Sequence, residues 1–248
     1  MDKIINAHAN LSPLGSKSMI FKEIPVKIFD EHRTAFYHWG NWHIKNKNKP
    51  NLITFDYHQD YGCASDIPEG LKKFFKQYGQ VDAFSLSYAT SFLLDQENDS
   101  QIEAAAKHNY IDSIFALHTK EEYKKNCISD CHGHKVFPEW DIKDFINTIL
   151  SEENLGHNDI YLDIDLDYFT IEEGARKDIT LCKKEEIIKK LKCIKKHILM
   201  NAYYQICGIT IATEPRCCGS IKNSNEILNL LDEYLFDSNL LRMDCEYD

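Results

Sequence analysis

The segment DIYLDIDLDYF constrains the fold of this chain more than any other stretch. Apolar residues alternate with Asp163, Asp165 and Asp167, and the two-residue period of a β-strand places all three carboxylates on one face. On a buried strand, desolvation and mutual repulsion make three neighbouring carboxylates costly or force them to take up protons. A bound divalent metal cluster removes that cost. The segment therefore favours a strand that carries acids to a metal site.

A second segment, NLITFDYHQD, runs an apolar strand into Asp56, His58 and Asp60, again at a spacing of two. Either motif alone is equally compatible with solvated acids at the turn after a strand. The presence of both favours metal binding, and carboxylates with one or two imidazoles suit Mn²⁺ best, with Zn²⁺ or Fe²⁺ as competitors. His32, in the pair Glu31-His32 after the strand IPVKIFD, is either a further ligand or an ordinary helix residue.

The order of elements indicates an α/β fold. Short apolar runs rich in β-branched and aromatic residues alternate with segments of helical period, which is typical of a parallel sheet covered by helices. We expect strands at residues 24–29, 52–57, 111–117, 160–166 and 206–213. Helices are expected at residues 31–45, 69–78, 140–152, 183–199 and 225–236, and an irregular loop at 120–138. Since parallel strands end at one edge, the acids should meet there.

Composition limits the class of protein. With 43% hydrophobic residues in 248, the chain can bury the core of one domain spanning 1–248. The net charge of -10 argues against a nucleic-acid partner. The absence of a leader-like start and of a long apolar run predicts no membrane partner and a cytoplasmic location. The odd number of cysteines, nine, is expected to remain mostly as reduced thiols.

One further group has the residue types of a zinc site: Cys127, Cys131, His132 and His134. Four ligands within eight residues are unusual for a closed tetrahedral site, so we favour an ordinary loop over a structural zinc. No glycine-rich phosphate loop is present in the sequence, which argues against nucleotide hydrolysis and hydride transfer.

The acid motifs resemble the metal-ligand motifs of the ureohydrolases, that is arginase, agmatinase and formiminoglutamase. The resemblance is closest to the branch that includes peptide arginases, in which a Glu-His pair, an Asp-x-His-x-Asp and a Leu-Asp-Ile-Asp-Leu-Asp-Tyr-Phe strand follow in that order. It extends to GITIATEPRCCG, where Glu214 follows a strand as does the glutamate that holds the guanidinium in arginases.

The resemblance implies a three-layer α/β/α arginase-like fold with a mostly parallel sheet and two Mn²⁺ ions. Asp56 and Asp163 would bridge the ions. His32 and Asp60 would complete one ion, His58 and Asp165 the other, and Asp167 would support the ligands from behind. These assignments complete the expected metal site.

The same resemblance implies hydrolysis of a guanidinium group. Asp60 would orient the attacking water and Glu214 would hold the guanidinium, although a glutamate before Pro215 is equally compatible with a surface acid. After the Asp-x-His-x-Asp motif the chain reads YGCASDIPEG, unlike enzymes that bind free arginine, so a peptide or another guanidino compound is the expected substrate. The products would be ornithine, within the peptide, and urea. His38 and His134 are candidate proton donors.

Two other readings remain open. A zinc-dependent deacetylase shares the arginase architecture but normally needs one metal. A non-catalytic binding protein stabilised by a structural ion would tolerate changes at Glu214, and removal of the metal would unfold it. Metal stoichiometry separates the first reading from a two-metal hydrolase, and the response to metal removal separates the second.

Overall fold

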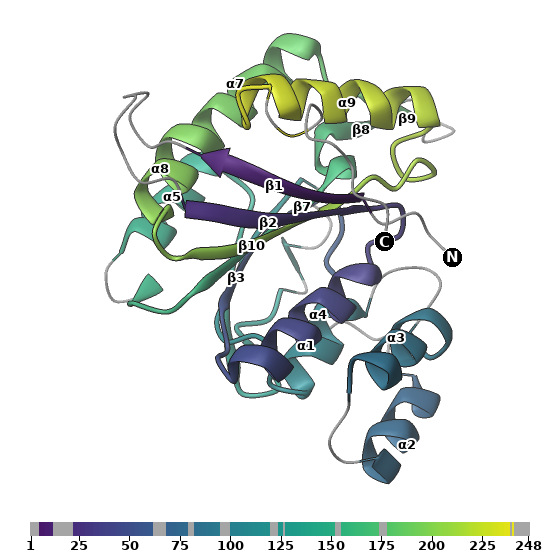
Figure 1. The fold of residues 1–248 in the computed structure, drawn as a ribbon. Coiled ribbons are helices and arrows are strands. Elements are labelled where there is room, and N and C mark those ends of the chain that lie inside the picture. Colours follow the sequence, from purple (N-terminus) through teal and green to yellow (C-terminus); the bar gives the residue numbers. More distant parts are fainter. Residues whose placement is uncertain are drawn as a thin grey trace.

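The structure is a computed structural model that describes residues 5–11, 22–61, 68–78, 82–94, 100–119, 124–125, 127–151, 155–173, 178–238 and 240. Helices cover both faces of a central sheet, which gives three layers (Figure 1). This arrangement confirms the expected α/β/α architecture.

The central sheet has eight strands in the order β1-β2-β10-β7-β3-β4-β6-β5. In chain order they are β1 (Ile5–Leu11), β2 (Lys22–Phe29), β3 (Asn51–Asp56), β4 (Ile114–His118), β5 (Asp130–Cys131), β6 (His134–Glu139), β7 (Ile160–Asp165) and β10 (Ile206–Ala212). Neighbouring strands pair in parallel along the series β2, β10, β7, β3, β4 and β6. Only the edge strands of this sheet, β1 and β5, pair antiparallel with their neighbours. A separate hairpin joins β8 (Thr170–Glu173) to β9 (Asp178–Leu181). The sheet is therefore mostly parallel, as expected.

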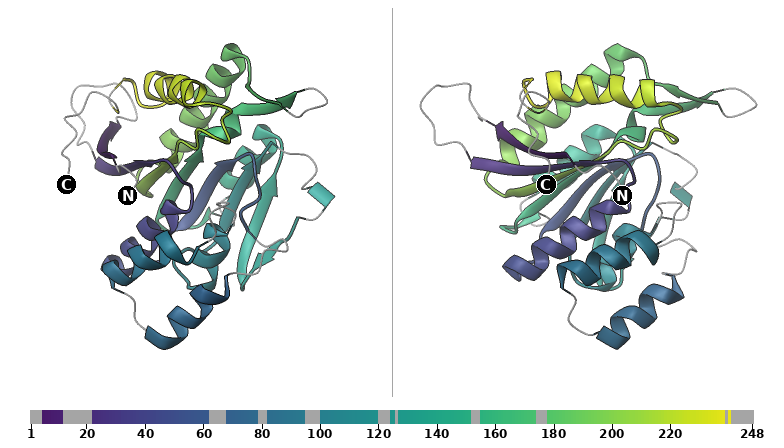
Figure 2. Two further views of the ribbon diagram at one scale, coloured as in Figure 1. Left: turned by 90° about the vertical axis from the view of Figure 1, so that its right-hand side faces the viewer. Right: turned by 45° about the vertical axis from the view of Figure 1, so that its right-hand side comes forward.

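The helices divide between the two faces, as the turned views show (Figure 2). One face, here called the α1 face, carries α1 (Thr34–Asn46), α2 (Glu69–Tyr78), α3 (Ala83–Phe92) and α4 (Gln101–Lys107). The other, the α9 face, carries α5 (Ile142–Leu150), α7 (Lys184–Ile194), α8 (Met200–Ala202) and α9 (Ile221–Tyr234). A π-helical turn, η3 (Lys195–Leu199), joins α7 to α8. A 3-10 turn, η2 (Leu166–Phe169), directly follows β7.

Alternation along β7 explains how the sheet separates apolar packing from acids. Leu162 and Ile164 pack in the apolar core of the α9 face, together with α5, α7 and α9. The residues that alternate with them, Asp163 and Asp165, point to the α1 face, where Tyr161 packs in the apolar core formed with α1 to α4. The period-two pattern read from the sequence is therefore confirmed, and it directs both carboxylates toward the layer of α1.

All five expected strands and all five expected helices are present; α2 has the expected bounds, and the other elements have shifted ends. Residues 120–123 and 126 of the expected loop at 120–138 lie outside the described residues. The expectation is wrong in the second half of this range, whose residues form β5 and most of β6, a short strand that pairs with β4. Two helices, α3 and α4, were not expected. Helix α3 has no charged residue and hence no polar stripe to reveal its period, and α4 has only seven residues.

Two expectations from composition can be compared with the described part of the chain. No helix there is long and apolar enough to cross a membrane. Seven cysteines lie within it, and all seven are free thiols, as expected; Cys63 and Cys245 lie outside the described residues.

Candidate metal centre

Four adjacent strands bring the predicted site residues to one edge of the sheet. β2, β10, β7 and β3 are neighbours, and their carboxyl ends lead into His32, Glu214, Asp165 and Asp56 respectively. We use the term acid cluster for the eight residues gathered there: His32, Asp56, His58, Asp60, Asp163, Asp165, Asp167 and Glu214. All except His58 are buried. The edge expected from the sequence is therefore the place where these side chains meet.

His32 lies at the centre of the acid cluster, and it is fully buried. Its Nδ1 atom lies 3.1 Å from Oδ2 of Asp60, 3.2 Å from Oδ2 of Asp165 and 3.3 Å from Oδ2 of Asp56. Among the described residues this nitrogen makes no hydrogen bond of acceptable geometry. One imidazole nitrogen thus faces three carboxylate oxygens that come from two strand ends.

The other ring nitrogen of His32 faces Asp163. Nε2 lies 2.8 Å from Oδ2 of Asp163, within hydrogen-bonding distance. Asp163 also accepts hydrogen bonds from the hydroxyls of Thr54, at 2.9 Å, and Thr210, at 2.6 Å. Both threonines are its register partners on the flanking strands β3 and β10. The Asp163 carboxylate is thereby fixed, and it in turn sets the orientation of the His32 ring.

A second group forms around His58, whose side chain is 37% exposed. Its Nδ1 atom lies 2.9 Å from Oδ2 of Asp167 and 3.9 Å from Oδ1 of Asp56. Two backbone donors hold the carboxylates, since the N–H of His58 donates to Asp56 at 2.6 Å and that of Tyr57 to Asp167 at 3.1 Å. Asp56 therefore belongs to both the His32 group and the His58 group.

Glu214 closes the cluster from the end of β10. Its Oε1 atom accepts the backbone N–H of His32 at 2.9 Å, and its side chain is buried. The backbone φ of Glu214 is +33°, in the left-handed region that non-glycine residues rarely adopt, and such strain is concentrated at functional sites. Ligand atoms of Glu214, Asp167 and Cys217 all lie within 4.8 Å of one another.

The structure also shows site residues that the sequence analysis missed. Gln101, at the start of α4, donates a short hydrogen bond to Oδ2 of Asp60. His118, the register partner of Asp56 on β4, is buried with Nε2 2.7 Å from the hydroxyl of Tyr61. His118 ends an apolar strand, so the signal that selected Asp56 could have found it. Nothing in the local sequence of α4 marks Gln101.

Charge is unbalanced in the acid cluster, because six carboxylates face two imidazoles. Burial, together with the charge of Asp60, raises the pKa of Asp56 to about 6, although His32 and His58 act in the opposite direction. Burial also raises the pKa values of Asp165, Asp167 and Glu214, and in each case a neighbouring carboxylate adds to the effect. Without cations, these acids therefore retain protons at pH values where an exposed carboxyl is ionised.

The two imidazoles respond in the complementary way. Burial opposes the charged form of His58, but the hydrogen bond and charge of Asp167 and the charges of Asp56 and Asp60 outweigh it and raise its pKa to about 10. The pKa of His32 is also well above its ordinary value, because Asp163, Asp165 and Asp56 outweigh its desolvation. Divalent cations would supply the positive charge that bound protons supply here.

The donor set fits divalent cations. Ligand atoms of His32, Asp56 and Asp165 lie within 4.8 Å of one another, as do those of Asp56, His58 and Asp167. Two groups that share one carboxylate match a pair of neighbouring cations, and oxygen donors with one imidazole each suit Mn²⁺, Zn²⁺ or Fe²⁺. The inward-facing Nδ1 of His32, without a hydrogen-bond partner in the described part of the chain, is the atom that such a cation would bind.

Several expectations about these motifs need correction in their local structure. β3 ends at Asp56 and β7 ends at Asp165, so His58 and Asp60 lie on the loop after β3, and Asp167 lies on the turn η2. Among the described residues, Asp163 belongs to none of the three groups of ligand atoms, whereas Asp167 belongs to two of them. The three acids Asp163, Asp165 and Asp167 therefore occupy different positions in the site, whereas a continuous strand would place them on one face.

The other candidates lie elsewhere. His38 stacks on Phe29, with ring centroids 5.6 Å apart, and burial lowers its pKa to about 3. His134 begins β6 and lies 3.5 Å from Asp112, at the amino end of the parallel strands and hence at the opposite edge from the acids. Cys127, Cys131, His132 and His134 form no metal-binding group in the described residues.

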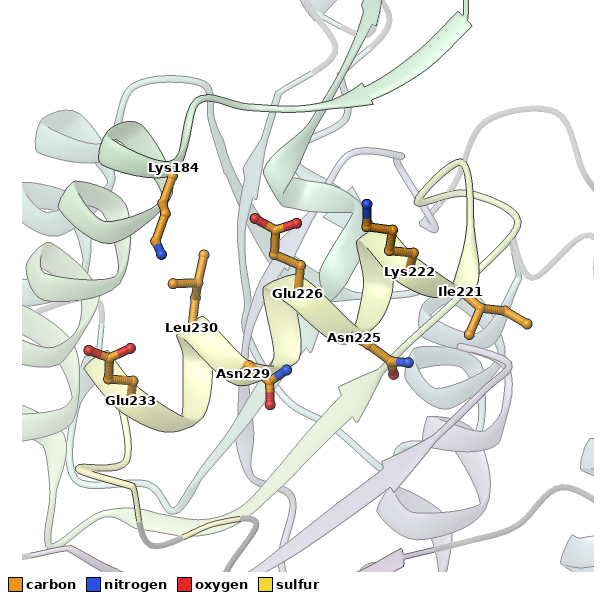
Figure 3. A pocket seen from close by; sticks show the side chains of 8 residues that line it. All are labelled: Lys184, Ile221, Lys222, Asn225, Glu226, Asn229, Leu230 and Glu233. Atoms are coloured by element: carbon orange, nitrogen blue, oxygen red, sulfur yellow. The ribbon is translucent and has the colours of Figure 1, made fainter.

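A surface depression of about 600 Å³ also lies apart from the acid cluster (Figure 3). It runs along the outer side of α9, whose buried residues pack on the α9 face of the sheet. Its lining combines Lys184 and Lys222 with Glu226 and Glu233. The acid cluster faces the other layer, so this depression is not part of the candidate metal centre.

No protein-family model matches the chain. No curated protein sequence matches it either. Solved structures that resemble it include proclavaminate amidino hydrolase from Streptomyces clavuligerus, with 14% identity and a TM-score of 0.45 over 85% of this chain and 63% of that chain. A hypothetical agmatinase from Burkholderia thailandensis shows 13% identity and a TM-score of 0.44, over 84% of this chain and 59% of that one. Helicobacter pylori arginase shows 17% identity and a TM-score of 0.45, over 83% and 72%.

The chain spans less than two thirds of the length of the first two of these structures. At identities of 13–17% and TM-scores of 0.44–0.45, these similarities assign no role to any residue of this chain. The roles of individual residues must therefore be argued from the geometry of the acid cluster.

Proposed function

We propose that this chain is a dinuclear metal-dependent hydrolase that cleaves a C–N bond of a guanidinium group. The observation that carries the proposal is the sharing of Asp56 between two groups of ligand atoms, one with His32 and Asp165 and the other with His58 and Asp167. A bridging carboxylate between two imidazole-containing groups is an arrangement suited to a pair of divalent cations.

We assign His32, Asp56, Asp60 and Asp165 to the first cation and Asp56, His58 and Asp167 to the second. This differs from the assignment that the family resemblance implies, which uses Asp163 and Asp165. The contacts that support the change are those of Asp163, whose oxygens face Thr54, Thr210 and the outer nitrogen of His32. A carboxylate behind a metal-binding histidine fixes the ring and raises its basicity. We therefore propose Asp163 as a positioning residue.

A bound pair of Mn²⁺ ions, or of Zn²⁺ or Fe²⁺, would supply Lewis acidity and a water molecule of lowered pKa. The protein contributes the alignment of that chemistry. Gln101 holds the Asp60 carboxylate, whose predicted role is to orient the attacking water. The helix α4 begins beside it, and the N–H of Glu103 donates to the Asp60 backbone oxygen at 3.3 Å.

Glu214 is proposed to hold the substrate. Its Oε1 accepts the His32 backbone N–H, and its carboxylate lies near Asp167 and Cys217 at the end of β10. A guanidinium is the planar cation that a carboxylate can bind through two parallel hydrogen bonds, and burial strengthens such a pair. The strained backbone of Glu214 supports a functional role for this residue.

The proposed reaction adds water across one C–N bond of the guanidinium. The oxygen of water bonds to the central carbon and loses both of its protons, the bond from that carbon to the substituted nitrogen breaks, and that nitrogen takes up the two protons and leaves as a protonated amine. The products are urea and an amine. Our proposed substrates are arginine side chains within peptides and small guanidino compounds. When the substrate is a peptidyl arginine, the amine product is an ornithine side chain.

The proposal is tested by measuring the metal content of the purified chain together with urea release from an arginine-containing peptide after loading with Mn²⁺. Two metal ions per chain and urea production, both lost in Asp56→Asn, are the expected results. A single metal ion with activity on an acylated amine would instead support the deacetylase alternative. Metal binding without any hydrolysis, and unfolding when the metal is removed, would support a structural ion.

A further inference from the structure

Helix α3 presents a row of aromatic side chains to solvent. Phe84 is 82% exposed, Tyr88 46% and Phe92 73%. Their spacing of four residues places them on one side of the helix, and the ring centroids of Tyr88 and Phe92 are 5.2 Å apart. Tyr88 also stacks on Phe74 of α2, with centroids 5.9 Å apart. We use the term aromatic patch for Phe84, Tyr88 and Phe92, which together form a continuous surface.

The aromatic patch faces away from the core of the chain. The buried residues of α3, Leu86, Ala89 and Thr90, lie on its other side. Helices α2 and α3 form the end of the molecule farthest from the α9 face (Figure 1, Figure 2). Single exposed aromatic residues are ordinary, whereas a contiguous apolar group marks an interaction site. We propose that the aromatic patch is the centre of an interface between two copies of this chain, in which the two α3 helices pack antiparallel.

The spacing of the aromatic patch suits a second copy of the same helix. Phe84 lies four residues before Tyr88, and Phe92 lies four residues after it. A twofold axis beside Tyr88 therefore brings Phe84 of one copy against Phe92 of the other, and the two Tyr88 side chains meet at the axis. Ser87 and Ser91, exposed between the aromatic residues, are small enough for rings to pack over them. A lipid surface or an unrelated protein requires no such symmetry.

Charge also favours contact between copies at this place. The net charge of -10 makes two copies repel one another, and like charges face to face disfavour association. Helix α3 contains no charged residue, and the adjacent α2 carries Lys72, Lys73 and Lys76 against one acid, Glu69. Asp82, the N-cap of α3, lies at opposite ends of an antiparallel pair in the two copies. The proposed contact therefore places no carboxylates of α3 opposite each other.

The area of the aromatic patch is sufficient for a reversible dimer. A fully buried phenylalanine or tyrosine contributes about 150–250 Å², so the exposed parts of the three side chains provide about 600–1,000 Å² over two copies. With the exposed Ala83, Ser87 and Ser91, the contact reaches about 1,000 Å², the area at which specific interfaces begin. We therefore expect a dimer in equilibrium with its monomer.

The test is sedimentation velocity of the full-length chain from low micromolar to submillimolar concentration. We expect a monomer–dimer equilibrium that shifts toward the dimer as salt is added, because salt screens the repulsion between acidic copies. Tyr88→Glu places two like charges at the twofold axis and should weaken the dimer about 100-fold or more. Tyr204→Glu, at a tyrosine that is 74% exposed outside α3, is the matched control and should dimerise as the wild type does. Circular dichroism establishes that both variants are folded.

Mixed variants test the antiparallel arrangement. Phe84→Lys and Phe92→Glu should associate with each other more tightly than Phe84→Lys associates with Phe84→Glu, because residue 84 of one copy faces residue 92 of the other. The opposite preference would overturn the antiparallel arrangement.

A chain that remains monomeric at every concentration would overturn the interface, as would a dimer of equal strength in Tyr88→Glu. A monomer that binds vesicles of phosphatidylcholine and phosphatidylserine, and loses this binding in Tyr88→Glu, would also overturn it and assign the aromatic patch to a lipid surface. These measurements do not depend on catalysis, so their outcome and that of the urea assay are independent.

Discussion

Asp163 and His32 are joined by a contact of 2.8 Å between Oδ2 and Nε2, so that the opposite ring nitrogen faces three other carboxylates. The pair unites β7 with the segment after β2, although β10 lies between these strands in the sheet. Asp163 reaches His32 from a position in which Thr54 and Thr210 hold it from both sides. This relationship separates the carboxylate that orients a ligand from those that face the cation.

The first prediction concerns Asp163. Replacing it by asparagine should keep the stoichiometry of two Mn²⁺ per chain but weaken binding about 10–100-fold, the usual effect of losing a group that orients a metal-binding histidine. Thr210→Val should weaken binding in the same direction. Titration calorimetry measures both. Thr90→Val, at another buried threonine on α3, is the control and should leave affinity unchanged. Complete loss of one metal ion in Asp163→Asn would make Asp163 a ligand.

The second prediction separates the acids at the end of β7. Asp167→Asn should lose the second cation and retain the first, because Asp167 lies with His58, whereas the His32 group does not contain it. Asp56→Asn should lose both, because its carboxylate is shared. Metal analysis after dialysis against Mn²⁺ gives the counts. Retention of two ions in Asp167→Asn would contradict the proposed ligand assignment. It would instead support Asp163 and Asp165 as the ligands from this segment.

The third prediction concerns Glu214. A glutamine in its place keeps an oxygen that can accept the His32 backbone N–H but removes the charge that would pair with a guanidinium. We expect unchanged metal content and a fall in kcat/KM of about 30-fold or more, since truncating one partner of a buried charged pair costs about 2–5 kcal/mol. Steady-state urea release measures this effect. Glu185→Gln, at an exposed position of α7, should be silent. Equal rates in both variants would contradict the substrate role of Glu214.

The fourth prediction follows from the raised pKa of His58. The folded, metal-free chain holds this proton with a pKa of about 10, against an ordinary value of 6.5. The resulting stabilisation is fully present below the ordinary value and is lost as the pH rises toward the folded value. The melting temperature of the chain in chelator should therefore fall between about pH 7 and 9.

Metal loading should remove that trend, because cations then take the place of the protons and bind more tightly as the ligands deprotonate. Thermal melts in Mn²⁺ and in chelator across the same pH range provide the comparison. The histidines with lowered pKa values, His38, His108 and His118, have completed their titration below this range and do not contribute. A melting temperature in chelator that rises with pH would contradict the prediction.

Most of the acid cluster could be predicted because it follows from strand periodicity. Alternation with apolar residues placed Asp163 and Asp165 on one face, and the common edge of parallel strands brought them to Asp56. The sequence does not reveal where β7 gives way to the turn η2, and this transition decides which acids share a position with His58. For this reason the family resemblance assigns Asp163 and Asp165 as metal ligands, whereas the geometry favours Asp165 and Asp167.

The residues that were missed depend on tertiary contacts or on weak local patterns. Gln101 reaches Asp60 from a helix 41 positions further along the chain, and its local sequence contains no sign of that contact. Helix α3 contains no charged residue, and its Phe84 and Phe92 are exposed. Its sequence therefore lacks the alternation of charged and apolar residues that indicates a helix. The strand β6 contains Pro138 and only two well-buried side chains, and its pairing with β4 rather than its own composition defines it.

The position of β10 has a consequence for the order in which the protein can mature. It is the last strand of the central sheet to be synthesised, yet it lies between β2 and β7, where it supplies Thr210 to Asp163 and leads into Glu214. On the ribosome, β2, β3 and β7 emerge first, and the space between β2 and β7 stays open until residues 206–212 follow. A nascent chain therefore contains His32, His58 and all of the acids except Glu214 before β10 completes the site. Metal capture should be a late event, coupled to the insertion of a single strand.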